Sequence, residues 1–123
     1  MLAPLWTPSP TRAAASAMLR FMETASRHAG REFDSYGELW RWSVEEPRAF
    51  WRLWLEESGI MWTGRAEPEL LGQQLPDARW FPNVELSFAE NLLRFDDDRP
   101  ALVSVSESRP TRRLSHAELR REV

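Results

Sequence analysis

The sequence contains no cysteine and no lysine among its 123 residues. Without cysteine, disulfide bonds, thiolate catalysis and cysteine-ligated zinc are excluded. Without lysine, the chain has no ε-amine to form a Schiff base or to hold phosphate in a Walker-type loop. All 16 basic residues are therefore arginine, and a bias toward GC-rich codons accounts for this choice without a functional role.

Glycine is scarce, and long apolar runs are absent. The five glycines stand alone at predicted helix stops and turns, so no glycine-rich loop brings backbone N–H groups toward a phosphate. No stretch approaches the roughly 18 apolar residues of a membrane-spanning helix. The N-terminus also lacks the basic and apolar regions of a signal peptide. We therefore expect a cytoplasmic protein with no membrane partner.

The charged and polar residues indicate no reaction chemistry. A net charge of −3 gives no electrostatic footprint for nucleic acid, so no nucleic-acid partner is expected. His28 and His116 lie far apart and are expected as exposed helix residues rather than a metal pair. The acidic run at 96–98 is expected as a solvated turn, and the glutamates at 45–46 and 56–57 as exposed ion-pair partners. Since no G-x-S-x-G nucleophile elbow is present either, the sequence offers no catalytic, cofactor-binding or metal-binding residue.

Helical patterns dominate the first 95 residues. Ser9 and Pro10 form a helix start and Gly30 a stop, with apolar residues recurring at helical spacing between them. Ser35 and Ser43, each with a glutamate three residues later, form capping-box patterns that predict two further starts. The predicted helices lie near residues 10–29, 35–42, 45–58 and 87–95.

Beyond the helices, the pattern predicts an irregular connection and then a hairpin. Isolated glycines and prolines at 60–80 favour a connection with a turn of helix at 67–72. Alternating apolar and polar residues after Pro100 predict a β-hairpin over 101–114. Ser115 and Glu118 then open a helix that is cut short by the end of the chain. The expected fold is mainly α, with a helical cap over 1–99 and the start of a second domain over 100–123.

Tryptophan is abundant, with seven residues in the chain, five of them between positions 40 and 62. Stacking platforms for single-stranded nucleic acid would need a basic groove, which is absent. A tryptophan-rich core or packing face is favoured, and a face for a partner domain is the other reading. Trp51 and Trp54 share an apolar stripe with Phe50 and Leu55, so we expect both to pack against helix 10–29.

Four segments, in order, resemble acetoacetyl-CoA synthetases, members of the adenylate-forming acyl-CoA synthetase superfamily. Residues 80–94, WFPNVELSFAENLLR, are similar to the family's WFPGARLNYAENLLR. Residues 6–9 resemble its W-x-P-S, residues 33–45 its F-x-S-Y-x-E-L-H-x-W-S-V-E, and residues 114–123 its L-T-Y-A-E-L-R-R-x-V. The chain departs from the family at Trp40, where histidine is usual, and at Ser87-Phe88, where asparagine and tyrosine are usual.

The resemblance implies an N-terminal segment of an ATP-dependent ligase. Such a ligase activates acetoacetate as an adenylate and transfers it to CoA, with Mg²⁺ screening the phosphates. The family's phosphate loop and its catalytic lysine have no counterpart in residues 1–123, so this chain is expected to be inactive alone. ATP, Mg²⁺ and CoA are thus implied only for the full-length family. The expected role is a helical cap plus the start of an α/β nucleotide-binding (AMP-binding) domain, with the remainder of the ligase as partner. The alternative is a stand-alone α-helical protein-interaction module with a tryptophan-rich face, and acetate and propionate stay open as acids beside acetoacetate.

Overall fold

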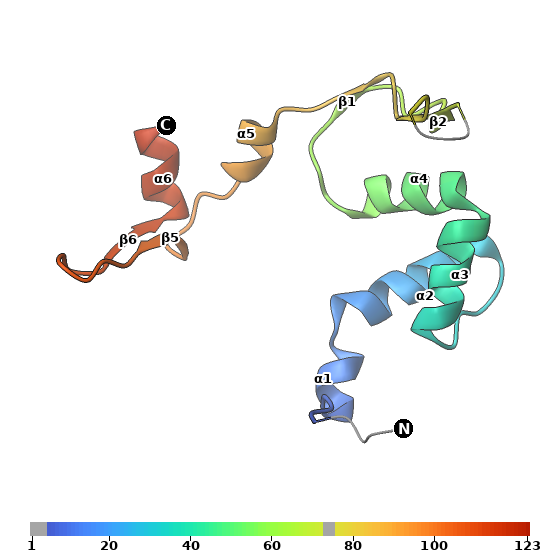
Figure 1. Cartoon of the computed structure of the whole chain (residues 1–123), viewed down its shortest axis with the longest axis horizontal. Coiled ribbons are helices and arrows are strands. Elements are labelled where there is room, and N and C mark those ends of the chain that lie inside the picture. Colours follow the sequence, from blue (N-terminus) through green and yellow to red (C-terminus); the bar gives the residue numbers. More distant parts are fainter. Residues whose placement is uncertain (1–4, 73–75) are drawn as a thin grey trace. The chain divides into compact units, whose positions relative to one another are not determined.

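The computed structural model describes residues 5–72 and 76–123 (Figure 1). The chain divides into two compact units. Unit 1 comprises Met1–Gly59 and Ala66–Pro82, and unit 2 comprises Ile60–Arg65 and Asn83–Val123. The fold is mainly α with small two-stranded sheets, as the sequence predicted.

The first helical region of unit 1 is two helices, α1 (Pro10–Ala14) and α2 (Ala17–Ala29) (Figure 1). The prediction of a single helix over 10–29 is therefore wrong at its middle. Ser16 has an extended backbone, and its hydroxyl accepts a hydrogen bond from the Leu19 N–H at 3.1 Å. A serine that caps a new first turn competes with continuation of the preceding helix, which explains the break.

The next two helices are α3 (Tyr36–Glu45) and α4 (Pro47–Glu57). Both were predicted, but their junction was misplaced, because Ser43 does not cap the second helix. Instead Ser43 lies inside α3, and its hydroxyl donates to the carbonyl of Trp40 at 2.7 Å. Pro47 provides the first residue of α4, since the missing N–H of a proline costs nothing at that position.

Helices α2, α3 and α4 enclose the core of unit 1. Trp42 of α3 is fully buried, with ring centroids of Phe33 and Phe50 at 5.3 and 5.7 Å. The core cluster consists of Met22, Ala25, Phe33, Leu39, Trp42 and Leu53.

Trp51 and Trp54 are not part of this core, because both are 40% exposed. The prediction that both pack against helix 10–29 as core residues is therefore wrong, although Trp54 lines a groove together with Met18 and Phe21 of α2. The inward face of α4 is set by Phe50 and Leu53. Trp51 follows Phe50 by one residue and is therefore rotated about 100° around the helix, away from the core.

Residues 66–82 complete unit 1 with a small antiparallel pair, β2 (Leu70–Leu71) and β3 (Arg79–Trp80). The turn of helix expected at 67–72 is wrong, since part of that segment forms β2. One isolated helical turn is unstable in water, whereas pairing Leu70 with Trp80 satisfies backbone groups of both strands.

Unit 2 begins with a second short pair, β1 (Thr63–Gly64) and β4 (Val84–Glu85), followed by α5 (Phe88–Leu92). Ser87 caps α5 as predicted, although the helix ends earlier than residue 95. The Asn91 side chain ties α5 to the chain before β1, because it accepts from the Met61 N–H and donates to the Met61 carbonyl, each at 2.8 Å.

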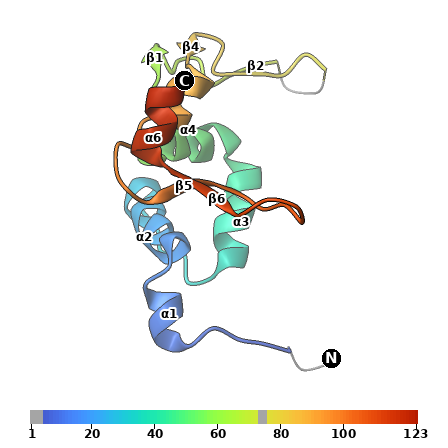
Figure 2. The same ribbon diagram turned by 90° about the vertical axis from the view of Figure 1, so that its left-hand side faces the viewer.

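The predicted hairpin is confirmed as β5 (Pro100–Ser104) and β6 (Arg112–Ser115), an antiparallel pair that leads directly into α6 (His116–Glu122) (Figure 2). The predicted capping box is also present. Ser115 accepts from the Glu118 N–H, and the Glu118 carboxylate accepts from the Ser115 N–H. Helix α6 packs against both strands of the hairpin.

Candidate interaction surface

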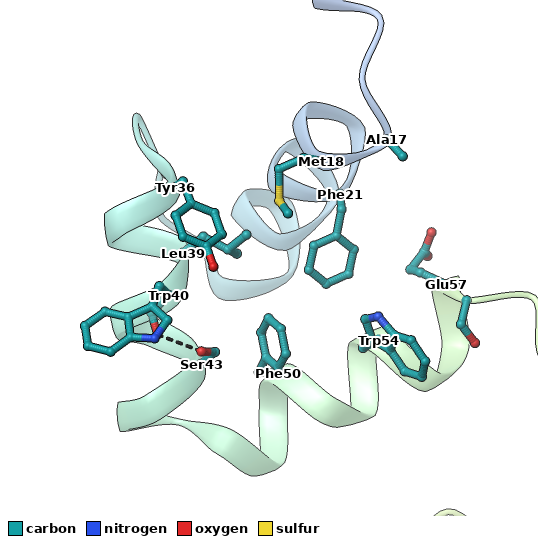
Figure 3. Close-up of a pocket in the computed structure, with 11 residues that line it drawn as sticks. Ala17, Met18, Phe21, Tyr36, Leu39, Trp40, Ser43, Phe50, Trp54 and Glu57 are labelled. Atoms are coloured by element: carbon teal, nitrogen blue, oxygen red, sulfur yellow. Dashed lines mark hydrogen bonds between the residues drawn. The ribbon is translucent and has the colours of Figure 1, made fainter. Parts of the chain in front are cut away.

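An apolar groove lies between α2, α3 and α4 of unit 1 (Figure 3). Its volume is about 410 Å³. The Phe21 and Phe50 rings meet edge to face at 5.8 Å, and Phe50 also contacts the buried Trp42, so the floor of the groove is part of the core. The groove is lined by Ala17, Met18, Phe21, Tyr36, Leu39, Trp40, Ser43, Phe50, Trp54, Glu57 and Ser58.

The chemistry of these eleven residues suits apolar side chains and not a nucleotide. No arginine or histidine is among them, and Glu57 would repel phosphate. The Ser43 hydroxyl already donates to the Trp40 carbonyl within α3 (Figure 3). Without cationic side chains, the groove cannot neutralise a polyphosphate.

A row of exposed aromatic rings runs from α4 to β3 in unit 1. Trp51 lies 5.7 Å from Trp54 and 6.0 Å from Trp80, between ring centroids, and Trp80 lies 6.1 Å from Phe81. The three tryptophans are each exposed by 40–41%. The two contacts of Trp51 are edge to face, and that of Trp80 with Phe81 is tilted. Such contacts hold large rings in fixed positions, so the row is a preformed apolar surface.

Phe81 ends this row with a strained backbone. Its φ of +44° lies in the left-handed region, which is unfavourable for a bulky residue. The Phe81 N–H donates to the Glu69 carbonyl at 2.8 Å, which fixes the turn after β3. The Trp80-Phe81-Pro82 segment is part of the family resemblance, but nothing in the sequence indicates a positive φ at Phe81.

Arg52 of α4 is the centre of an ion-pair cluster on unit 1. It pairs with Glu56 one turn later, and with Glu67 and Glu69 from the segment leading into β2. Hydrogen bonds to Glu56 and then Glu67 raise the pKa of the Arg52 guanidinium above its ordinary value. The sequence predicted the ion pair at Glu56, whereas the two partners from beyond residue 60 required the fold.

The acidic run at 96–98 does more than face solvent. The Asp97 carboxylate accepts hydrogen bonds from Arg99 at 2.7 Å and lies 2.7 Å from His116 Nδ1. The Arg99 and His116 hydrogen bonds hold the pKa of Asp97 well below its usual range. His116 is consequently half-buried rather than exposed as expected, whereas His28 is exposed. His28 belongs to unit 1 and His116 to unit 2.

Within residues 5–72 and 76–123, no cluster of three or more histidine, aspartate or glutamate side chains could hold a metal ion. Over the same residues, no helix is long and apolar enough to cross a membrane.

Comparison with known proteins identifies the same segment repeatedly. Residues 36–92 match a protein family described as "Acetyl-coenzyme A synthetase N-terminus". Acetoacetyl-coenzyme A synthetase of Rhizobium meliloti is 35% identical over 117 residues, which are 95% of this chain and 18% of that protein. Acetoacetyl-CoA synthetase of Xenopus tropicalis is 32% identical over 124 residues, or 97% of this chain and 18% of the relative.

A solved structure agrees with these relatives. The acetoacetyl-CoA synthetase from Streptomyces lividans matches 98% of this chain and 19% of its own, with 34% identity and a TM-score of 0.86. Over residues 36–92 the chain thus matches the N-terminus of acetyl-coenzyme A synthetases. More particularly, it is homologous to the N-terminal segment of acetoacetyl-CoA synthetases, which confirms the resemblance of the four sequence segments, and it spans about 18% of the length of these relatives.

Proposed function

We propose that this chain forms the N-terminal structural segment of an ATP-dependent ligase that joins acetoacetate to CoA and releases AMP and pyrophosphate. One observation carries the proposal: the match to acetoacetyl-CoA synthetases runs through 95–98% of the chain and is accompanied by a TM-score of 0.86. The remainder of such a ligase is the proposed partner of this segment.

The segment's own role in the proposal is structural. The groove of unit 1 does not fit a nucleotide, the chain has no lysine, and its five glycines are isolated. ATP, Mg²⁺ and CoA would therefore be held by the remainder of the ligase. We keep the division predicted from sequence, in which residues 1–99 form a helical cap and residues 100–123 begin the nucleotide-binding domain.

A chimera tests the proposal directly. The matching segment of the Streptomyces lividans acetoacetyl-CoA synthetase is replaced by this chain, and acetoacetate-dependent exchange between ATP and pyrophosphate is measured. We expect a folded chimera that retains exchange. Because the groove holds no arginine or histidine to pair with a carboxylate, acetate and propionate should be discriminated as in the parent enzyme. A folded chimera without exchange would contradict the proposal.

The isolated chain provides the complementary prediction. It should show only background exchange with ATP and acetoacetate, because no phosphate loop and no lysine are present in it. Exchange well above background from the purified 123-residue chain would show that it carries catalytic groups of its own.

A second candidate function is a stand-alone protein-interaction module. It is favoured by the exposed row of Trp51, Trp54 and Trp80, because fixed aromatic rings are common anchors at protein interfaces. The chimera separates the two candidates, since a module unrelated to ligase folding would not complete the Streptomyces lividans enzyme.

A further inference from the structure

The arm that precedes α1, residues 5–9, holds its apolar side chains in solvent. Leu5 is 106% exposed and Trp6 is 68% exposed. Two prolines, Pro8 and Pro10, restrict the backbone at the end of the arm, and Ser9 between them is extended, with φ −63° and ψ 152°. A stiff, extended segment loses little conformational entropy when it docks, so this arm is suited to bind an apolar surface.

The arm presents a positive charge beside its largest ring. The guanidinium of Arg12 in α1 lies 5.9 Å from the centroid of the Trp6 ring, which is a cation–π contact. Among residues 5–72 and 76–123, no carboxylate forms an ion pair with Arg12. Residues 5–22 also contain no aspartate or glutamate. The arm and α1 therefore form an apolar segment that carries positive charge.

The groove between α2, α3 and α4 has the complementary chemistry. Glu57 is the one charged residue among those that line it, and within the described part of the chain no arginine or histidine pairs with Glu57. Figure 3 shows Trp54 beside Glu57 on one side of Phe50, with Tyr36 and Trp40 on the other side. An occupant of this groove therefore needs apolar side chains together with a positive charge.

The junction between α1 and α2 holds the arm out of the groove of its own chain. The Ser16 N–H donates to the Ala13 carbonyl at 3.1 Å, and the Arg20 guanidinium donates to the Ala15 carbonyl at 2.8 Å. These bonds fix the direction of α1 relative to α2, and with the junction so fixed the arm remains exposed. The groove of a second copy is not subject to this constraint.

We propose that two copies of this chain exchange their N-terminal arms, so that residues 5–9 of each copy dock in the groove between α2, α3 and α4 of the other. Leu5 and Trp6 cover the apolar lining of the groove, and Arg12 pairs with Glu57 of the other copy. Because each copy gives one arm and receives one, the contact is two-fold symmetric and closes as a dimer. All of these residues belong to unit 1, and the inference does not depend on the proposed function.

Sedimentation equilibrium of the 123-residue chain tests the exchange. We expect a dimer that dissociates to monomer on dilution. Trp6→Ala should raise the dissociation constant at least about tenfold, because buried tryptophan anchors dominate many interfaces. The circular dichroism of this variant should equal that of the parent, since Trp6 is exposed within its own chain. A chain that stays monomeric up to about 1 mM would overturn the inference.

A charge exchange tests whether the groove is the docking site. Arg12→Glu and Glu57→Arg each bring like charges together and should each raise the dissociation constant at least about tenfold. The double variant restores opposite charges and should return to within about threefold of the parent. Arg109→Glu, at an exposed position in unit 2, makes the same charge change outside the arm and the groove and should leave the dimer unchanged.

The outcomes of the charge exchange decide the pairing. Dimerisation that neither single variant weakens would show that the two copies meet at another surface. Failure of the double variant to restore the dimer would show that Arg12 and Glu57 do not face each other. Either result would overturn the inference.

A spin label distinguishes a second copy from the chain's own arm as the occupant. Because the sequence has no cysteine, Thr7→Cys gives a single labelling site on the arm. Spin-labelled chain is mixed with unlabelled, 15N-enriched chain, and the indole N–H signals of Trp40 and Trp54 in the enriched copy should broaden. Broadening only when label and 15N are in the same copy would place the arm in its own groove and overturn the inference.

Discussion

At the scale of single residues, Trp42 is the side chain on which unit 1 most depends. It is fully buried among Phe33, Phe50 and the other core residues, and its indole Nε1 has no hydrogen-bond partner among residues 5–72 and 76–123. That unsatisfied N–H costs about 1–3 kcal/mol, and the cost is offset by the apolar area that the ring buries.

We predict that Trp42→Ala lowers the free energy of unfolding of unit 1 by about 3–5 kcal/mol. Trp51→Ala is the matched control and should cost less than about half as much, because Trp51 is 40% exposed. Urea unfolding followed by circular dichroism measures both midpoints. If the two variants shift the midpoint equally, Trp42 is not the main core residue.

The tryptophan content predicted a helical core rich in aromatic rings, but not which rings form it. Trp42 and Trp51 both lie on amphipathic helices, and their neighbours in the sequence are similar in character. The choice between them depends on how α3 and α4 pack on α2, which is a property of the tertiary fold and cannot be obtained from local periodicity.

Asp97 gives a pH-dependent prediction at the same scale. Its pKa is lowered mainly by the hydrogen bond from Arg99 and next by that from His116. A carboxyl with a lowered pKa in the folded state stabilises that state above its unfolded pKa of about 4 and loses this contribution as the pH falls toward the folded value. The effect is small, because the side chain is 37% exposed and screened by solvent.

Amide exchange at the start of α6 measures this effect. The N–H groups of His116 and Ala117 donate to the carbonyls of Arg99 and Asp97 at 3.1 Å each. Below about pH 4 their protection should fall in the native chain, and Asp97→Asn should remove this pH dependence. An identical acid response in the variant would exclude Asp97 as its source.

At the scale of elements, the pair formed by β1 and β4 depends on Gly64. Its φ is +92°, and an added Cβ would lie 2.1 Å from the Asn83 carbonyl oxygen. That oxygen accepts the Arg65 N–H at 3.0 Å. Gly64→Ala should therefore separate the strands and raise the exchange rate of the Arg65 amide at least about tenfold.

Gly37 of α3 supplies the control for this change. An added Cβ there lies 3.8 Å from Ser35 Oγ, an ordinary contact. Gly37→Ala should leave Arg65 exchange unchanged and stabilise α3 by up to about 1 kcal/mol. Equal Arg65 exchange in the two variants would show that β1 and β4 tolerate a side chain at Gly64.

Three helix starts were predictable because a serine cap precedes a helical pattern. Ser35, Ser87 and Ser115 all cap helices, as expected from the sequence. Ser43 was misassigned as a helix cap, and the cap formed by Ser16 was not predicted, both for one reason. A serine hydroxyl can accept from a new first turn or donate to a carbonyl within an existing helix, and packing against neighbouring helices decides between these two uses.

At the scale of the whole molecule, the sequence predicted the family and the mainly helical fold, but not the distribution of buried surface. Ordered motifs identify relatives without any knowledge of packing. The division into units does depend on packing, because residues 66–82 join the helices of unit 1 while residues 60–65 pair with the later part of the chain. The ion pairs of Arg52 show the same dependence on packing. Glu67 and Glu69 lie near Arg52 only because residues 66–82 join the helices of unit 1.

The uneven burial leads to a prediction for the isolated chain. Unit 1 holds every buried hydrophobic residue of the described chain, and unit 2 holds none. Since burial of apolar surface is the main favourable term in folding, unit 2 should unfold at a lower urea concentration than unit 1. Trp42 belongs to unit 1, and Trp62 is the one tryptophan of unit 2, so their indole N–H resonances in a single NMR titration report on the two units separately. We expect the native Trp62 signal to disappear first. Loss of both signals at one urea concentration would show that the units unfold as one cooperative domain.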